Sequence, residues 1–194
     1  NKGMVDGKRI LTEKSVQQMV YPHVKMDPER FYGYGLTINP NYFGDTLIEH
    51  GGSLQSISSK FGMIIEKGVS VIVLANLSGF PASRTMELAL NAYFNRDIDA
   101  QPFVYEAYSV DDETLASYQG IYRSRELEDV TIEVNNDETE LYYKEKKYPI
   151  KWIREHVFLA EMDDTLEPIE IIVDENGAPT AMSIFHRIVP KLNK

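Results

Sequence analysis

Two apolar segments on either side of Lys67-Gly68 constrain the fold of this chain more than any other feature. Residues 59–66 and 69–76 are rich in β-branched and apolar side chains, and the two residues between them are typical of a tight hairpin turn. The second segment carries apolar side chains at both odd and even positions. Because such a strand is usually covered on both faces, the sequence predicts a β-hairpin inside a layered structure that also contains helices.

Further elements are predicted on both sides of this hairpin. Residues 13–20 and 82–94 have the composition and periodicity of helices, and the second helix is expected to pack on the hairpin. Residues 31–38 alternate aromatic, glycine and β-branched residues, which predicts a strand that ends at Asn39-Pro40. The first part of the chain is therefore predicted to be α+β.

The composition changes within residues 97–110, which lack periodicity, and we place a boundary between residues 104 and 105. Residues 1–104 hold 10 Lys+Arg and 10 Asp+Glu, whereas residues 105–194 hold 10 and 20. The whole net charge of −10 therefore lies in the second part, which indicates two domains with different surfaces.

The second part is predicted to be a small all-β antiparallel barrel or sandwich, because short strand patterns follow one another between turn signals. Turns are expected at Asn135-Asn136-Asp137 and at Asn176-Gly177. The predicted strands are residues 120–124, 130–134, 140–144, 148–153, 157–161, 169–173 and 181–186.

Composition excludes several classes of function. A net charge of −10 disfavours nucleic acid as a partner, since binding a polyanion requires a basic surface. The absence of cysteine excludes thiol catalysis, disulfides and thiolate metal sites. No apolar run approaches the roughly 20 residues of a membrane-spanning helix. The chain shows no leader segment and no initial Met, which fits either a processed chain or an excised piece.

The four histidines are the side chains that titrate nearest to neutral pH. They form neither an HExxH motif nor a pair at i, i+4, so the sequence predicts no metal site, and nothing in it indicates a cofactor. We interpret His23, His156 and His186 as structural residues.

His50 differs because Gly51, Gly52 and Ser53 follow it beside the predicted hairpin. Two glycines leave the backbone bare, so that a substrate chain could pair with it and the N–H of Ser53 could face a developing oxyanion. The residues also fit a tight Gly-Gly turn next to a buried histidine. Spacing alone leaves both interpretations open.

The order of three segments, YGYGLTI, IEHGGSLQSIS and FGMIIEKGVSVIVLAN, followed by a helix, resembles the C-terminal part of the serine β-lactamase and penicillin-binding-protein group. The likeness is closest to class C β-lactamase-related peptidases and esterases, and it covers residues 1–96. Residues 105–194, with the segment YQGIYR, are similar to the lipocalin-like barrel that follows this catalytic domain in some members.

The resemblance implies a fold and a function. It implies an incomplete β-lactamase-like antiparallel sheet with packed helices, followed by the barrel. His50, Gly51 and Gly52 would match the family's third motif, His50 orienting the substrate or completing a proton network, and the amide of Ser53 would be half of the oxyanion hole. A histidine there carries less charge than a lysine, which favours peptide, amide or ester hydrolysis through an acyl-enzyme over penicillin binding.

The chain departs from the family in one respect. No Ser or Thr is followed by Lys three positions later, so the family's nucleophile motif is absent. A Tyr-x-Asn at Tyr93-Phe94-Asn95 lies after the third motif and on a predicted helix, and we interpret it as coincidence. The chain is therefore expected to be inactive alone and to associate with the missing N-terminal part or with itself. The resemblance also favours an extracytoplasmic location.

An alternative is a binding or assembly module without catalytic activity. The barrel could hold a small apolar ligand, or the acidic barrel could mediate contacts between subunits. Aromatic side chains would line such a ligand cavity, although filling of a small barrel core explains them more simply. These residues are Tyr142, Tyr143, Tyr148, Trp152, Phe158 and Phe185.

Overall fold

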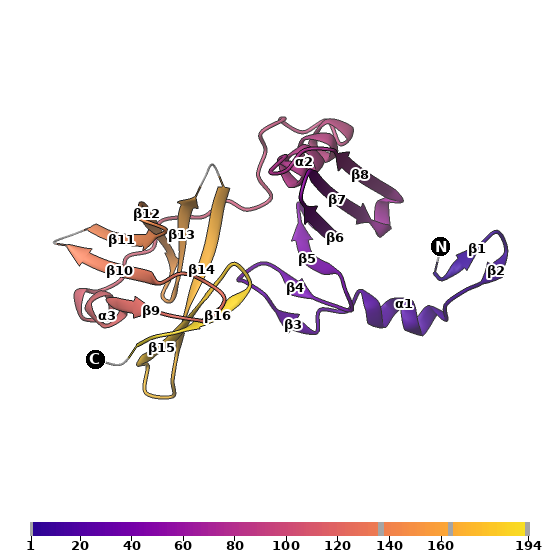
Figure 1. Ribbon diagram of the computed structural model, residues 1–194. Helices are drawn as coiled ribbons and strands as arrows, with labels where there is room; N and C mark the ends of the chain where they lie inside the picture. The colour runs from indigo at the N-terminus through magenta and orange to yellow at the C-terminus, as the bar shows by residue number, and fades with distance from the viewer. Residues whose placement is uncertain (1, 136–137, 163–164, 193–194) are drawn as a thin grey trace. The chain divides into compact units, whose positions relative to one another are not determined.

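A computed structural model describes residues 2–135, 138–162 and 165–192 of the chain (Figure 1). The chain folds as two compact units, residues 1–104 and 105–194. Both are dominated by antiparallel sheets. Within the described residues, no helix is both long and apolar enough to cross a membrane.

The first unit is built on a six-stranded sheet in the order β3-β4-β5-β6-β7-β8, in which all neighbours are antiparallel. Its strands are β3 (Val24–Lys25), β4 (Phe31–Tyr32), β5 (Thr37–Tyr42), β6 (Asp45–Leu54), β7 (Ile57–Ile64) and β8 (Val69–Ala75). A short hairpin and a helix precede the sheet: β1 (Met4–Val5), β2 (Lys8–Arg9) and α1 (Glu13–Met19). A helix follows it, α2 (Ala82–Tyr93).

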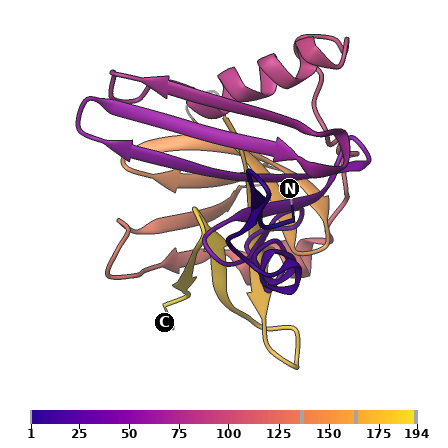
Figure 2. The ribbon, with the colours of Figure 1, turned by 90° about the vertical axis from the view of Figure 1, so that its right-hand side faces the viewer.

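Helix α2 lies along one face of the strands β7 and β8, as Figure 2 shows. Met86 and Leu90 of this helix are buried against Leu47 and Ile64 of the sheet. Gly62 faces the same helix, and a Cβ at Gly62 would overlap with the Sδ atom of Met86. The predicted packing of the helix on the hairpin is thus observed, and it depends on a residue without a side chain.

The prediction that the strand over residues 69–76 is covered on both faces is wrong within this unit. The even-numbered side chains Ile72 and Leu74 are 70% and 79% exposed. Val71 and Val73, on the other face, pack against the core beneath α2. The reason is that α2 covers one face of the sheet, so the strand alternates between buried and open positions although its sequence does not alternate.

The expected strand over residues 31–38 is divided in two. β4 ends at Tyr32, and a turn closed by the Gly33 N–H donating to the Leu36 carbonyl (2.8 Å) leads into β5. β5 continues past Asn39-Pro40 because a register shift lets the sheet accommodate a residue without an N–H. The predicted two-residue turn at Lys67-Gly68 is instead a short 3₁₀ turn that Gly68 ends with a φ of 66°.

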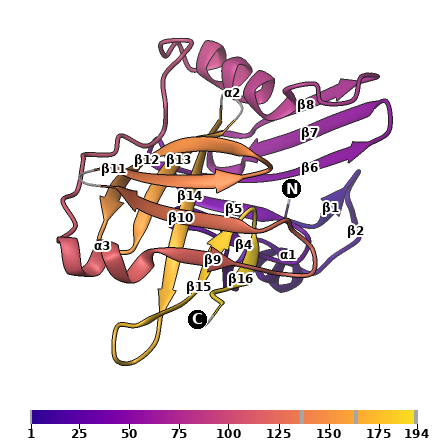
Figure 3. The same cartoon turned by 60° about the vertical axis from the view of Figure 1, so that its left-hand side comes forward.

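The second unit is an antiparallel meander of eight strands in sequence order. Its elements are α3 (Asp112–Tyr118), β9 (Gly120–Tyr122), β10 (Val130–Asn135), β11 (Glu138–Tyr143), β12 (Lys146–Arg154), β13 (Val157–Met162), β14 (Thr165–Val173), β15 (Pro179–Ile184) and β16 (Arg187–Pro190). A bridge between Tyr122 and Lys191 joins the two ends of this sheet, so that the barrel is nearly closed. Figure 3 shows α3 beside β9 and β10.

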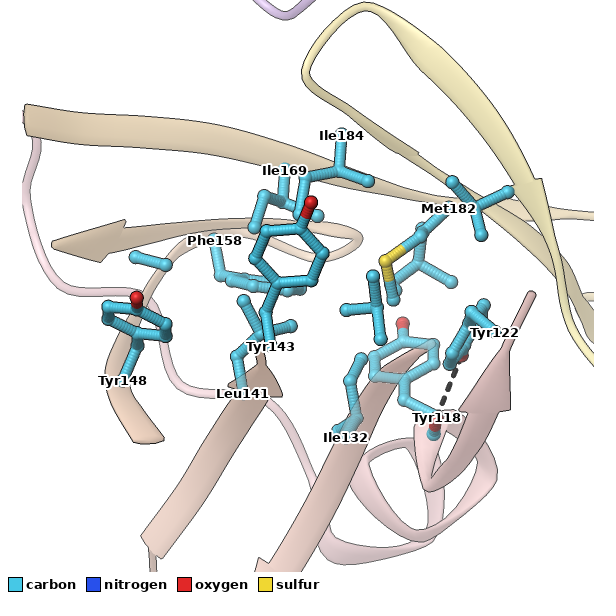
Figure 4. Close-up of a cluster of buried hydrophobic side chains, with 14 of the residues drawn as sticks. Tyr118, Tyr122, Ile132, Leu141, Tyr143, Tyr148, Phe158, Ile169, Met182 and Ile184 are labelled. Atoms are coloured by element: carbon cyan, nitrogen blue, oxygen red, sulfur yellow. Dashed lines mark hydrogen bonds between the residues drawn. The ribbon is translucent and has the colours of Figure 1, made fainter. Parts of the chain in front are cut away.

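Large apolar side chains pack against one another in the interior of the barrel (Figure 4). Tyr118 of α3 and Tyr122 of β9 are fully buried, and the Tyr122 hydroxyl donates to the Tyr118 carbonyl (2.8 Å). The indole ring of Trp152 stacks on Tyr118, with ring centroids 5.2 Å apart. Helix α3 thus contributes a fully buried side chain to the core of the barrel.

The predicted strands of this unit correspond to β9 through β15, with ends that differ by a few residues. The last predicted strand ends at residue 186, so the sequence prediction missed β16, which follows β15 after a two-residue turn. It also missed α3, whose start is marked by Asp111 accepting a hydrogen bond from the Thr114 N–H (2.9 Å). Asn136 and Asp137 of the expected turn lie outside the described residues.

Candidate functional site

Residues 50–53 lie in the second half of β6, at an open edge of the sheet. β5 begins at Thr37, which pairs with Glu49, so β5 flanks β6 only over residues 45–49. β7 continues alongside β6 as far as the pair of Leu54 with Ile57. Beyond Glu49, β6 therefore has a strand neighbour on one side only, and its other side presents unpaired backbone groups.

The backbone groups at this edge can be assigned from a side-chain contact. The Ser59 hydroxyl of β7 donates to the Gly52 carbonyl (3.3 Å), which places that carbonyl on the β7 side of β6. Successive residues of a strand direct their N–H and C=O groups to alternate sides. The backbone groups of Gly51 and Ser53 therefore point to the open edge, where an added strand would find them.

His50 is held at the same edge by a residue of another strand. Its Nε2 atom lies 3.2 Å from the Tyr32 hydroxyl, and the two rings are tilted with centroids 6.3 Å apart. β4 carries Tyr32 toward β6 because Tyr32 pairs with Thr37, which in turn pairs with Glu49, the neighbour of His50. The imidazole is exposed and hydrogen-bonded through one nitrogen, so that its position is defined while it remains open to solvent.

A cavity of about 330 Å³ borders the strand at this point. It lies over β6, β7 and β8, and its apolar wall is formed by Phe61, Ile72 and Leu74. His50 stands directly opposite Phe61 across the β6–β7 pair. A polar edge and an apolar wall thus meet at His50, an arrangement that suits a substrate with a peptide-like backbone and an apolar side chain.

An ion pair lies behind the edge, on the face that α2 covers. Glu49 and Lys60 are 3.1 Å apart, and both side chains are largely buried. Burial in the same region raises the pKa of Glu87 on α2, an effect that the Arg84 guanidinium partly offsets. The Lys60 side chain passes beneath Gly51, with its Cδ 3.6 Å from where a Cβ would be. The pair thus packs against the bare backbone of the edge from the covered face.

The described residues do not place a lysine next to a serine in the way that acylation requires. Ser59 and Lys60 are neighbours on one strand, so their side chains point to opposite faces of the sheet. Lys60 pairs with Glu49, whereas Ser59 bonds to Gly52. The geometry can bind and orient a substrate, and it contains no activated nucleophile of the Ser–Lys type among these groups.

Some of these residues were missed at the level of sequence. Tyr32 was assigned to a strand but not to the site, because nothing in its spacing from His50 shows that β4 and β6 converge. Ile72 and Leu74 belong to the strand that was predicted to be covered on both faces, and Phe61 was given no role. The alternation that separates the two faces of β8 is hidden because every residue but one in that strand is apolar.

Comparison with known proteins rests on structure alone, since no family model and no curated protein match the sequence. The fold is similar to SurE determined with D-Leu (TM-score 0.66, 16% identity), over 94% of this chain and 44% of that one. A second SurE structure matches with a TM-score of 0.60 and 17% identity, over 94% and 43%. The octameric penicillin-binding protein homologue from Pyrococcus abyssi matches with a TM-score of 0.47 and 21% identity, over 94% and 42%.

The similarity to SurE extends over both units of the chain, because it covers 94% of the residues. At this level of identity the comparison establishes a shared fold. The chain spans less than half the length of the chains that it matches.

Proposed function

We propose that this chain forms the substrate-binding edge of a serine acyl hydrolase of the β-lactamase and penicillin-binding-protein type. In this proposal the acylated serine and its lysine lie on polypeptide outside the 194 residues. An extended acyl substrate, a peptide, amide or ester, pairs with the open edge of β6. The sequence resemblance, in which His50-Gly51-Gly52 matches the family's third motif, supports the same assignment.

The observation that carries the proposal is the interruption of pairing at Glu49. It leaves the backbone groups of Gly51 and Ser53 directed to an open edge. A substrate that adds as a strand there satisfies these groups, and the Ser53 N–H is then in position to donate to the oxyanion of a tetrahedral intermediate. The glycines allow the close approach of a second backbone.

The other groups of the site have supporting roles in this proposal. His50, fixed by the Tyr32 hydroxyl, orients the substrate or passes a proton to the leaving group. The apolar wall of the cavity accepts the side chain of the acyl donor. Since SurE has been determined with D-Leu, a D-leucyl ester is the first substrate to test.

The experiment uses two substitutions at Ser53 in the full gene product. Ser53→Pro removes the N–H, whereas Ser53→Ala keeps it and removes only the hydroxyl. We expect Ser53→Pro to lower kcat/KM by about 10²- to 10³-fold, the usual cost of one oxyanion donor, and Ser53→Ala to change it by less than about twofold. Equal effects of both variants on a folded protein would overturn the proposal.

A further inference from the structure

The barrel of the second unit holds a cavity of about 860 Å³ at one end. Because the strands are antiparallel and follow in sequence order, the connections after β9, β11 and β15 lie at the same end of the barrel. Leu127, Lys144 and Phe185 from these three connections line the cavity. Its volume is within the range of pockets that hold small molecules.

A tyrosine of α3 reaches the opposite end of the barrel. Tyr118 of α3 extends its hydroxyl to the turn between β12 and β13, where it donates to the Glu155 carbonyl (3.1 Å) and meets His156 Nδ1 (2.6 Å). This turn lies at the other end of the strands from the cavity, because it follows an even-numbered strand. The cavity and this contact therefore lie at opposite ends of the barrel, and the end with the cavity is called its mouth below.

The wall of the cavity is aromatic. Tyr143 and Tyr148 project from β11 and β12 and are largely buried, and Phe185 contacts Tyr143 with ring centroids 5.4 Å apart. Met162 adds a flexible apolar side chain. Such a wall fits a flat apolar body better than a long polar chain.

Two turns at the mouth have unusual residues. Lys144 and Glu145 have φ values of 50° and 61°, and Phe185 and His186 have φ values of 50° and 60°. Turns of this type favour Asn-Gly, because large side chains are strained at positive φ. Lys144 and Phe185 line the cavity from these strained positions. Side chains retained against backbone strain often have a functional role.

Charged side chains of both signs line the cavity: Lys144, Lys146 and Arg187 together with Glu126 and Glu167. Lys144 is the cation on the turn between β11 and β12. Its Nζ lies 5.3 Å from the centroid of the Tyr143 ring, and among the described parts of the chain it forms no ion pair. Arg187 directly follows the strained turn between β15 and β16, and it is paired with Glu126. Lys144 can therefore bind an anion without giving up a carboxylate partner among these residues.

We propose that the mouth of the barrel binds a small aryl carboxylate. The rings of Tyr143, Tyr148 and Phe185 hold the aromatic body, and Lys144 holds the carboxylate. The residues of this site all belong to the second unit, so the proposal does not depend on the acyl hydrolase proposal.

The test uses the 194-residue chain, calorimetric titration and two probes of similar shape, 2-naphthoate and the neutral 2-naphthalenemethanol. Lys144→Asn and Phe185→Asn are suitable variants, since Asn tolerates positive φ and the turns should stay folded. Lys8→Asn, an exposed lysine of the first unit, is the matched control. Emission of Trp152, the single tryptophan, confirms that the barrel is folded in each variant.

We expect 2-naphthoate to bind the unaltered chain more tightly than the alcohol. Lys144→Asn should weaken the naphthoate by about tenfold and the alcohol by less than about twofold, consistent with loss of one charge-assisted contact. Phe185→Asn should weaken both probes by about tenfold, and Lys8→Asn neither. No binding of naphthoate, binding that both barrel variants leave unchanged, or an equal loss of both probes in Lys144→Asn would overturn the proposal.

Discussion

The Tyr32 hydroxyl and the His50 Nε2 atom, 18 residues apart in sequence, form a hydrogen bond of 3.2 Å at the open edge of β6. The contact joins the short strand β4 to the segment that carries the glycines. It restricts the rotation of the imidazole and links its tautomer to the orientation of the hydroxyl. In the proposed function this pair positions the one titratable side chain of residues 50–53.

Tyr32→Phe in the full gene product should lower kcat/KM by about three- to tenfold, because it removes one hydrogen bond worth roughly 1 kcal/mol. His50→Ala should lower it further, by about 10²-fold or more, if the imidazole transfers a proton. The double variant should be no slower than His50→Ala, because the tyrosine acts through the histidine. Steady-state kinetics of the three variants measure this. Losses that multiply would show that the two residues act separately.

The open face of β8 should drive self-association of the isolated chain. Ile72→Ser combined with Leu74→Ser should shift sedimentation velocity profiles toward the monomer, because both side chains are exposed and apolar. Val71→Ser, on the face beneath α2, is the matched control and should instead lower the free energy of unfolding by about 1–3 kcal/mol. A chain that is monomeric before any substitution would contradict the prediction.

Gly62→Ala should destabilise the first unit by about 1–3 kcal/mol, because the new methyl group meets Met86 in a closely packed layer. Ser70→Ala on the exposed face of β8 should change the stability by less than about 0.5 kcal/mol. Scanning calorimetry is the appropriate measurement, since the single tryptophan, Trp152, lies in the second unit. Equal effects of the two substitutions would argue against the packing of α2 described above.

The stability of the barrel should fall at alkaline pH. Burial raises the pKa of Tyr118 to about 12, from about 10 in an unfolded chain. The folded barrel thus favours the protonated phenol, and this contribution is complete below pH 10 and is lost as the pH rises to 12. The free energy of unfolding, followed by Trp152 emission, should fall by up to about 1.4 kcal/mol per pH unit from this residue. The slope should be smaller in Tyr118→Phe, and an unchanged slope would contradict the assignment.

Much of this architecture could be predicted from the sequence because local patterns dominate it. The strands of the barrel alternate or end at turn residues, and the helix over residues 82–94 has a clear apolar face. The edge of β6 could be suspected from two adjacent glycines after His50. These features depend on neighbours in sequence, which a single chain displays directly.

The parts that could not be predicted depend on contacts between distant segments. Nothing in the sequence of β8 shows that Ile72 and Leu74 lie on an open face, because a strand that is apolar at all positions but one does not reveal what covers it. The contact of Tyr32 with His50 requires β5 to begin at Thr37, one pair short of the histidine. The mouth of the barrel depends on positive φ values at Lys144 and Phe185, where residue type gives no warning.

The central claim is that an acyl substrate pairs with the open edge of β6. Hydrogen exchange of the full gene product, free and trapped as a covalent acyl-enzyme with a peptide-like inhibitor, measures this directly. The account predicts that the amides of Gly51 and Ser53 exchange at least about tenfold more slowly in the adduct, because they become paired. Unchanged exchange at both amides in a stoichiometric adduct would contradict it.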